Sequence, residues 1–458
     1  MLELYDEAFP DLKPTKAAFA EELVKGVAEF AEVDFPGVVN TREQVDQAVA
    51  RFENKGVDLL IVVLLSYTDS LIALPALRRT RLPILVFNTQ QLAGVTERTL
   101  FSDIIENHSL PGVQDLTNVL RRVGRSFCIL TGHYKDPATI EALRGWCEAA
   151  RVVAFLRGAK IGLLGYPFKG MGDFRIDETM LLAWLGVEAT QVSLGLVAEY
   201  AQAAPPDDIE RQKATDRETF EVDSDVSEGE HEAGARLEWA LRRIALEYGL
   251  AGFAPNFAAI MEDGRIAGLP FLASCKLLGD GIAIGGEGDA VGATVVAMMA
   301  WLTGAATFTE TFTADFKHDA IWMNHMSEGN WKLARRDEPV RLVRADFPKT
   351  DPATVNLTFA LEPGEVTLVN LATVADGRLK LICAEGEVLD FRVLEEYRTP
   401  NFKFRPAMRA CDFLTQYSLA GGSHHMALAY GRQAATVEKI GAILGVPTET
   451  LATLLTRA

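Results

Sequence analysis

The chain has no excess of positive charge, few cysteines and no long apolar run, and each absence excludes a class of protein. Asp and Glu outnumber Lys and Arg by 63 to 45, which gives a formal net charge of −18. Nucleic acids and anionic membranes attract basic surfaces, so neither is expected as a partner. No uninterrupted apolar stretch is long enough to span a bilayer. The opening residues 1–7 lack the basic start and apolar core of a signal peptide, so none is predicted.

The pattern of cysteines also excludes two kinds of stabilising framework. The five cysteines are scattered, odd in number and form no CxxC pair. A disulfide framework needs paired cysteines, and a zinc knuckle needs closely spaced ones. The pattern therefore predicts buried free thiols in a reducing cytoplasm.

The N-terminal third alternates helical patterns with apolar strand patterns. The spacing of apolar residues predicts helices over 14–33 and 42–55, and the continuous apolar run over 57–65 is typical of a strand buried in a parallel sheet. Residues 83–87 and 126–130 are expected to form further short strands. This alternation predicts a doubly wound α/β domain over residues 1–155. Such a domain usually opens with a strand, for which only residues 2–5 are available, so either the sheet is one strand short or the true start lies upstream.

A second α/β domain is predicted over residues 156–303. A strand at 160–164 precedes the glycine-rich loop Lys169-Gly170-Met171-Gly172-Asp173, whose spacing does not match the dinucleotide fingerprint GxGxxG. The acidic stretch 205–230 is interpreted as solvated helix and loop, with a mobile flap over a site as the alternative. A helix over 232–248 and a strand over 252–257 are expected to follow.

The remaining residues, 304–458, have the pattern of a β-rich domain. Strands are predicted at 340–343, 354–360, 365–372, 378–383 and 387–394, and Asp376-Gly377 is a strong hairpin signal. A helix is predicted over 426–444. The fold class is therefore α/β, with two doubly wound parallel-sheet domains followed by a mostly antiparallel β domain, which is a small barrel or a sandwich.

Two glutamates in the second half lie in settings that suit a ligand site. Glu287 lies in the glycine-rich turn Gly285-Gly286-Glu287-Gly288-Asp289, at the carboxyl end of a predicted strand, where ligands usually bind in α/β sheets. The alternative is a helix cap with incidental acids. Glu310 lies between Phe308 and Phe312 on one face of a predicted strand. A carboxylate on an inward face is costly unless it is paired or bound to metal, whereas on an outward face it would be unremarkable.

Three histidines complete the set of candidates. His325 lies between two methionines, where a core role competes with a ligand role. His424 and His425 follow Gly421-Gly422, just ahead of the predicted helix. Adjacent histidines rarely both bind one ion from a regular element, so one is expected as a ligand and the other as a contact to substrate. His318 is predicted to be a surface residue, and His231 is given no role. Two carboxylates with two imidazoles form a suitable ligand set for Mn²⁺ or a similar ion.

The order of these segments resembles the L-arabinose isomerase family. The matching segments are GEGD at 286–289, the strand with F-x-E at 308–310, H-M at 325–326 and GG-x-HH at 421–425, together with Leu130-Thr131-Gly132-His133 and Phe87-Asn88-Thr89-Gln90. The resemblance implies that Glu287, Glu310, His325 and His425 bind a divalent metal, with Mn²⁺ favoured and Co²⁺, Fe²⁺ or Mg²⁺ possible. It also implies that His133 reaches the active site of a neighbouring subunit in a homo-oligomer, a trimer or a hexamer.

Two segments depart from that family. The family's N-terminal strand and its Q-H-L-Y-G loop have no counterpart, and Leu110-Pro111-Gly112-Val113-Gln114-Asp115 replaces its A-H-G-x-R-E segment. Both departures fall on substrate-binding regions, so isomerase chemistry is expected to be kept while arabinose itself is doubtful.

The implied function is a metal-dependent aldose–ketose isomerase that acts on a pentose, hexose or deoxy sugar. Glu287 and Glu310 are the expected pair for moving a proton between two sugar carbons, while His133 and His424 are expected to contact the sugar. The alternatives are a hydride shift, epimerase, lyase or dehydratase chemistry at the same site, and a non-catalytic sugar-binding protein.

Overall fold

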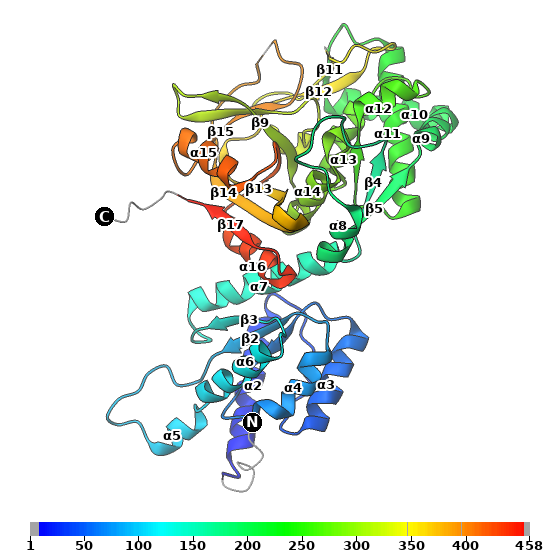
Figure 1. Ribbon diagram of the computed structural model, residues 1–458. Helices are drawn as coiled ribbons and strands as arrows, with labels where there is room; N and C mark the ends of the chain where they lie inside the picture. Colours follow the sequence, from blue (N-terminus) through cyan, green and yellow to red (C-terminus); the bar gives the residue numbers. More distant parts are fainter. Residues whose placement is uncertain (1–8, 346, 395, 453–458) are drawn as a thin grey trace. The chain divides into compact units, whose positions relative to one another are not determined.

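The computed structural model describes residues 9–345, 347–394 and 396–452, and the predicted opening strand at 2–5 lies outside them. The chain forms two compact units, residues 1–154 and 155–458 (Figure 1). Each is described by itself, and the division into three domains stays a prediction. No helix among the described residues combines the length and the apolar character needed to cross a membrane.

The first unit is built on a three-stranded parallel sheet with the order β1-β2-β3. Alternate residues of the central strand belong to different apolar clusters: Ile84 and Val86 cluster with Leu116, whereas Leu85 and Phe87 cluster with Leu143. The sheet is thus covered on both faces, as the doubly wound prediction requires. The elements of this unit are α2 (Leu12–Ala28), α3 (Arg42–Lys55), β1 (Leu60–Val62), α4 (Ser70–Arg79), β2 (Ile84–Asn88), α5 (Phe101–Glu106), α6 (Leu110–Arg122), β3 (Cys128–Thr131) and α7 (Pro137–Leu156).

The second unit opens with a four-stranded parallel sheet of order β5-β4-β7-β8. The acidic stretch forms α10, a short strand and the start of α11, and α10 buries Lys213 and Asp216. The elements of this part are β4 (Lys160–Leu164), α8 (Glu178–Leu185), β5 (Glu188–Val192), α9 (Leu194–Ala203), α10 (Pro206–Thr219), β6 (Glu221–Val222), α11 (Glu228–Tyr248), β7 (Gly252–Pro255), α12 (Phe257–Asp263), α13 (Phe271–Gly279), β8 (Ala283–Ile284), the 3₁₀ turn η1 (Gly286–Gly288) and α14 (Ala290–Thr303).

A mostly antiparallel sheet follows, with the order β13-β16-β9-β10-β15-β14-β17. Because β13 also pairs with β14, the strands from β13 to β14 close into a barrel, and β17 is added outside as a parallel strand. The elements are β9 (Thr307–Asp315), β10 (Ala320–Asn324), η2 (Trp331–Leu333), β11 (Arg341–Arg344), β12 (Val355–Thr358), β13 (Gly364–Thr373), η3 (Ala375–Gly377), β14 (Leu379–Val388), β15 (Asn401–Pro406), α15 (Ala410–Ala420), β16 (His425–Tyr430), α16 (Ala434–Leu444) and β17 (Thr448–Leu451).

Helix α14 joins the parallel sheet to the barrel. Its sequence, AVGATVVAMMAWLT, is apolar on all sides, and its residues from Ala290 to Met299 are all buried. A helix of this composition is stable only when it is enclosed. It packs against β7 and β8 of the parallel sheet and against β13 and β16 of the barrel. The turn that precedes α14 is therefore held next to the barrel strands.

The predicted fold class is confirmed, and the antiparallel part is a barrel rather than a sandwich. Two predictions at the level of single elements are wrong, and two of the predicted strands form outside the barrel. The helix expected over 426–444 is a strand, β16, followed by the shorter helix α16. No separate strand forms over 387–394, where β14 ends at Val388. Strands β11 and β12 leave the barrel and pair with β6 in a three-stranded sheet of their own.

Candidate metal centre

Glu287 is presented by the turn between β8 and α14. Its backbone has φ 61° and ψ 17°, in the left-handed region that side chains other than glycine rarely occupy. The backbone N–H of Phe168 donates to the Glu287 carbonyl oxygen at 3.0 Å. Such conformations cost about 1–3 kcal/mol and persist where the surrounding structure enforces them, which is common at functional sites.

The other expected ligands come from neighbouring barrel strands. Glu310 on β9 is paired in register with His425 on β16 and with Asn324 on β10. His325 directly follows Asn324. The order β16-β9-β10 therefore brings both histidines next to the Glu310 carboxylate from opposite sides.

The aromatic flanks of Glu310 differ from the prediction. Phe308 is buried, and its ring lies 4.8 Å from the ring of His325 and 4.7 Å from that of His425. Phe312 is 39% exposed instead. Trp322 pairs with Thr313 but Met323 pairs with Thr311, so the register shifts across Phe312. This bulge breaks the period of two, and the side chain of Phe312 leaves the inward face.

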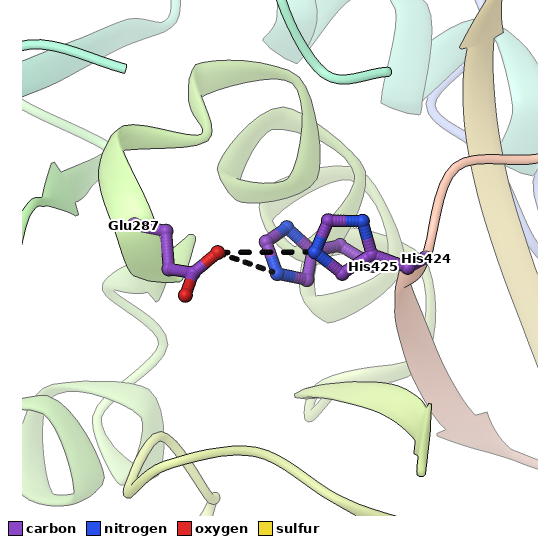
Figure 2. A group of neighbouring side chains, drawn as sticks. All are labelled: Glu287, His424 and His425. Carbon is purple, nitrogen blue, oxygen red and sulfur yellow. Dashed lines mark ion pairs between the residues drawn. The ribbon is translucent and has the colours of Figure 1, made fainter. Parts of the chain in front are cut away.

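The polar ends of these side chains converge in two overlapping groups. One group is Glu287, His424 and His425, and the other is Glu310, His325 and His425; within each group the ligand atoms lie within 4.8 Å of one another. Nε2 of His425 and Nε2 of His424 both lie 3.8 Å from Oε2 of Glu287, as Figure 2 shows. Nε2 of His424 also lies 3.9 Å from Oε2 of Glu310.

Each of the two expected histidine ligands has a carboxylate on its other nitrogen. Nδ1 of His425 lies 2.9 Å from Oδ2 of Asp289, and Nδ1 of His325 is hydrogen-bonded to Glu328. Asp289 also caps α14, because its Oδ1 accepts the Gly292 N–H at 2.8 Å. A carboxylate on Nδ1 fixes the ring and leaves Nε2 as the ligand atom, an arrangement that is common around protein-bound metals.

The protonation states follow from burial and from these pairs. Burial, helped by the two neighbouring imidazoles, lowers the pKa of His425 well below its usual value, so this ring is neutral. Burial alone would lower the pKa of His325, but the Glu328 carboxylate outweighs it and the pKa rises to about 9. Burial raises the pKa of Asp289 to about 7 and also raises the pKa of Glu310.

The residues present suit a divalent ion. Oε2 of Glu287 and Nε2 of His425 are buried and have no hydrogen-bond partner within the described chain. Buried polar atoms without partners are rare and need an explanation, and a bound ion is one. Two carboxylates and two imidazoles form a donor set that Mn²⁺, Co²⁺, Fe²⁺ and Zn²⁺ accept.

Glycines give this centre the space it needs. A Cβ on Gly286 would lie 2.4 Å from Cε1 of His325, and a Cβ on Gly422 would lie 2.2 Å from the ring of Tyr417. Tyr417 in turn donates from its hydroxyl to the carbonyl of Ser423, directly before the histidine pair. The backbone therefore approaches the ligand residues more closely than a larger residue would allow.

Three other histidines are placed in different ways. His318 is exposed and paired with Asp315, which confirms its surface assignment. His231 is buried, and its Nε2 lies 2.9 Å from Oδ2 of Asp216. His133 lies in the first unit, with Nε2 3.2 Å from the carbonyl oxygen of Gln91, and its contribution to the active site of a neighbouring subunit stays a prediction.

Sequence reasoning missed the residues that support the expected ligands. Asp289 was within reach, because an acid just ahead of a helix marks a cap. Glu328, three residues after His325, gave no signal of its own. Asp173 ends the glycine-rich loop and Phe174 follows it, and neither carries a ligand signal in the sequence. Asp173 nevertheless contacts His424, and the ring of Phe174 lies 5.1 Å from that of His425.

Comparison with known proteins identifies one family. The chain matches the L-arabinose isomerase central domain over residues 177–305 and the L-arabinose isomerase C-terminal domain over residues 305–447. An L-arabinose isomerase from Phocaeicola vulgatus is 24% identical over 94% of this chain and 88% of the relative. One from Geobacillus kaustophilus is 24% identical over 96% and 92%, and one from a Nocardioides species is 25% identical over 81% and 75%. The chain therefore belongs to the L-arabinose isomerase family of aldose–ketose isomerases, which are intramolecular oxidoreductases.

Proposed function

We propose that this chain is a divalent-metal-dependent isomerase that interconverts a small aldose and its ketose. The observation that carries the proposal is that Glu287, Glu310, His325 and His425 fall in two overlapping groups that share His425. Within the described residues, buried Oε2 of Glu287 and Nε2 of His425 have no hydrogen-bond partner. The curated relatives are L-arabinose isomerases, so L-arabinose is the first sugar to test, followed by other pentoses, hexoses and deoxy sugars.

These same four residues would hold the ion, which we propose to be Mn²⁺, with Co²⁺, Fe²⁺ or Mg²⁺ as alternatives. When bound, such an ion polarises a carbonyl oxygen and stabilises negative charge on the sugar oxygens. Neutral His425 offers Nε2 without first losing a proton, whereas protonated His325 has to release one on ligation.

The two glutamates are proposed to move the proton. Isomerisation removes a proton from one sugar carbon and returns it to the neighbouring carbon through an enediol. Burial raises the pKa of Glu310, which makes this carboxyl better able to take up a proton, and the nearby Glu287 carboxylate acts in the same direction. Both Glu287 and Glu310 face Nε2 of His424, so the three groups border one space.

The substrate is proposed to be an uncharged sugar that His424 helps to hold. Glu287 and Glu310 both border the space, and their negative charges would repel a phosphate group. We also propose that the chain is a homo-oligomer, a trimer or a hexamer, in which His133 contacts sugar bound to a neighbouring copy. Sedimentation, together with sugar affinity in His133→Ala, tests this part separately.

The deciding experiment is turnover of a panel of aldoses and ketoses by Mn²⁺-loaded protein, followed by proton NMR in D₂O. Interconversion with deuterium at the exchanging carbon is expected. Interconversion without deuterium would replace the enediol route by a hydride shift. Protein that binds no Mn²⁺, Co²⁺, Fe²⁺ or Mg²⁺ in calorimetry would overturn the proposed function.

A further inference from the structure

The loop after β4, residues 165–175, closes one side of the metal centre. Its Phe168 N–H donates to the Glu287 carbonyl, and its Phe174 ring is stacked on the ring of His425. Arg175 fixes the loop on itself by donating to the carbonyl of Met171 at 2.9 Å and to that of Phe168 at 3.3 Å. The glycine-rich loop 169–173 is thus part of the wall of the site.

The contact of Asp173 with His424 is the most specific one in this loop. One carboxylate oxygen, Oδ2, accepts both the backbone N–H of His424 at 3.0 Å and its ring Nδ1–H at 2.6 Å. Two bonds to one residue determine both the position of its main chain and the rotation of its ring. The ring nitrogen left over, Nε2, lies 3.8 Å from Glu287 and 3.9 Å from Glu310.

We infer that Asp173 is a positioning residue for the isomerisation, and that it acts by holding Nε2 of His424 toward the space between the Glu287 and Glu310 carboxylates. This inference rests on the proposed function. Asp173 holds His424 in the same way as Asp289 holds His425: each carboxylate binds Nδ1 of its histidine, so that Nε2 faces the centre. The two pairs differ in role, because His425 binds the ion whereas His424 contacts the sugar oxygens.

The exposure of the groups supports this division. The side chains of His424 and Asp173 are 31% and 39% exposed, whereas those of His425 and Asp289 are 0% and 1% exposed. A ring that contacts an exchanging substrate needs access from solvent, and a ring that binds only a resident ion does not. A carboxylate that merely stabilised the fold at this exposure would contribute little.

The test is a double-mutant cycle with Asp173→Ala, His424→Ala and the double variant, each loaded with Mn²⁺. We expect each single change to lower kcat about 10- to 100-fold, as loss of alignment at a reacting group does. We expect the double variant to be only slightly slower than His424→Ala, because His424→Ala already removes the ring and leaves only the backbone bond to Asp173. Losses that multiply in the double variant would overturn the inference.

Three further measurements separate positioning from other roles. The Kd for Mn²⁺ should stay within about threefold of wild type in Asp173→Ala; a loss above tenfold would place Asp173 with the metal ligands instead. Asp173→Glu should recover part of kcat, which loss of folding would not allow. The matched control is Asp177→Asn, which changes a carboxylate at the start of α8 that accepts only from Thr179 and the helix backbone.

The last readout does not depend on activity. In metal-free wild-type protein, a downfield imidazole N–H proton resonance from His424 is expected in NMR spectra, identified by its loss in His424→Gln. It should disappear in Asp173→Ala and remain in Asp177→Asn. Its absence from wild type would overturn the inference even if the protein is an isomerase. Its presence in a protein that turns over no sugar would refute only the proposed function.

Discussion

Asp289→Asn tests how the candidate metal centre fixes His425, the most buried of its expected ligands. Asp289 uses one oxygen to cap α14 and the other to bind Nδ1 of His425. An asparagine has only one oxygen for these two tasks. If this oxygen keeps the cap, the amide NH₂ faces Nδ1 and favours the tautomer with its proton on Nε2, which then cannot bind metal. If the amide flips, the cap is lost instead.

The two outcomes have different magnitudes. Loss of a carboxylate that supports a histidine ligand weakens metal binding about 10- to 100-fold, which is about 1.4–2.7 kcal/mol. Loss of the cap costs about 1 kcal/mol of stability. Calorimetric titration of metal-free Asp289→Asn with Mn²⁺, together with urea unfolding, separates them, and Asp177→Asn serves as the control at another helix start. Unchanged Mn²⁺ affinity together with unchanged stability would refute the reasoning.

Three other perturbations test separate parts of the structure. Burial lowers the pKa of Lys16 from 10.5 to about 8, although the negative charge of Glu106 acts in the opposite direction. Between pH 8 and 10.5 the folded state therefore binds fewer protons than the unfolded state, and the free energy of unfolding should rise with pH by up to about 3 kcal/mol. Urea unfolding of wild type and Lys16→Met across that pH range measures the difference. Gly286→Ala should weaken Mn²⁺ binding and cost about 1–3 kcal/mol, because its Cβ meets a buried imidazole, while Gly229→Ala, where a Cβ meets nothing, should not. Asp216→Ala removes a carboxylate shared by a buried histidine and a lysine and should cost about 3–5 kcal/mol; a midpoint equal to wild type would contradict this.

Local sequence signals predicted the elements whose ends are determined by residues next to them in the sequence. The helix predicted over 42–55 is α3 at both ends, because Thr41 forms a capping box with Gln44 and Gly56 takes the left-handed conformation at the other end. The hairpin predicted at Asp376-Gly377 is likewise present between the antiparallel strands β13 and β14, although residues 374–378, with the 3₁₀ turn η3, connect them in place of the expected two-residue turn. In both places the residues that determine the structure are neighbours in the sequence.

The prediction failed where pairing between distant strands decides the structure. Residues 426–430, Met-Ala-Leu-Ala-Tyr, favour a helix by local propensity, yet they form β16 between β9 and β13. Pairing on both edges and full burial outweigh a propensity difference of a few tenths of a kcal/mol per residue. The bulge at Phe312 was equally hidden, because a period of two indicates a face and cannot locate an extra residue.

In the candidate site, too, contacts between distant segments could not be predicted from the sequence. The residue types and their order in the sequence indicated a ligand set, but the partners on each Nδ1 depend on where separate segments meet. Asp289 reaches His425 across 136 positions, and Asp173 reaches His424 across 251. No local pattern contains such a contact, so the supporting carboxylates could be identified only in the fold.

We expect metal binding and sugar preference to depend on different parts of this chain. The segments that resemble the family's ligand segments lie on the turn before α14 and on the barrel strands β9, β10 and β16, and the register of these strands fixes them relative to one another. The segments that depart from the family lie before residue 116, within the first unit. Because the departures leave the ligand segments unchanged, Mn²⁺ affinity and deuterium exchange are expected to follow the family while the preferred sugar differs. A chain that bound Mn²⁺ and turned over L-arabinose better than every other sugar in the panel would show that the departing segments do not determine the substrate.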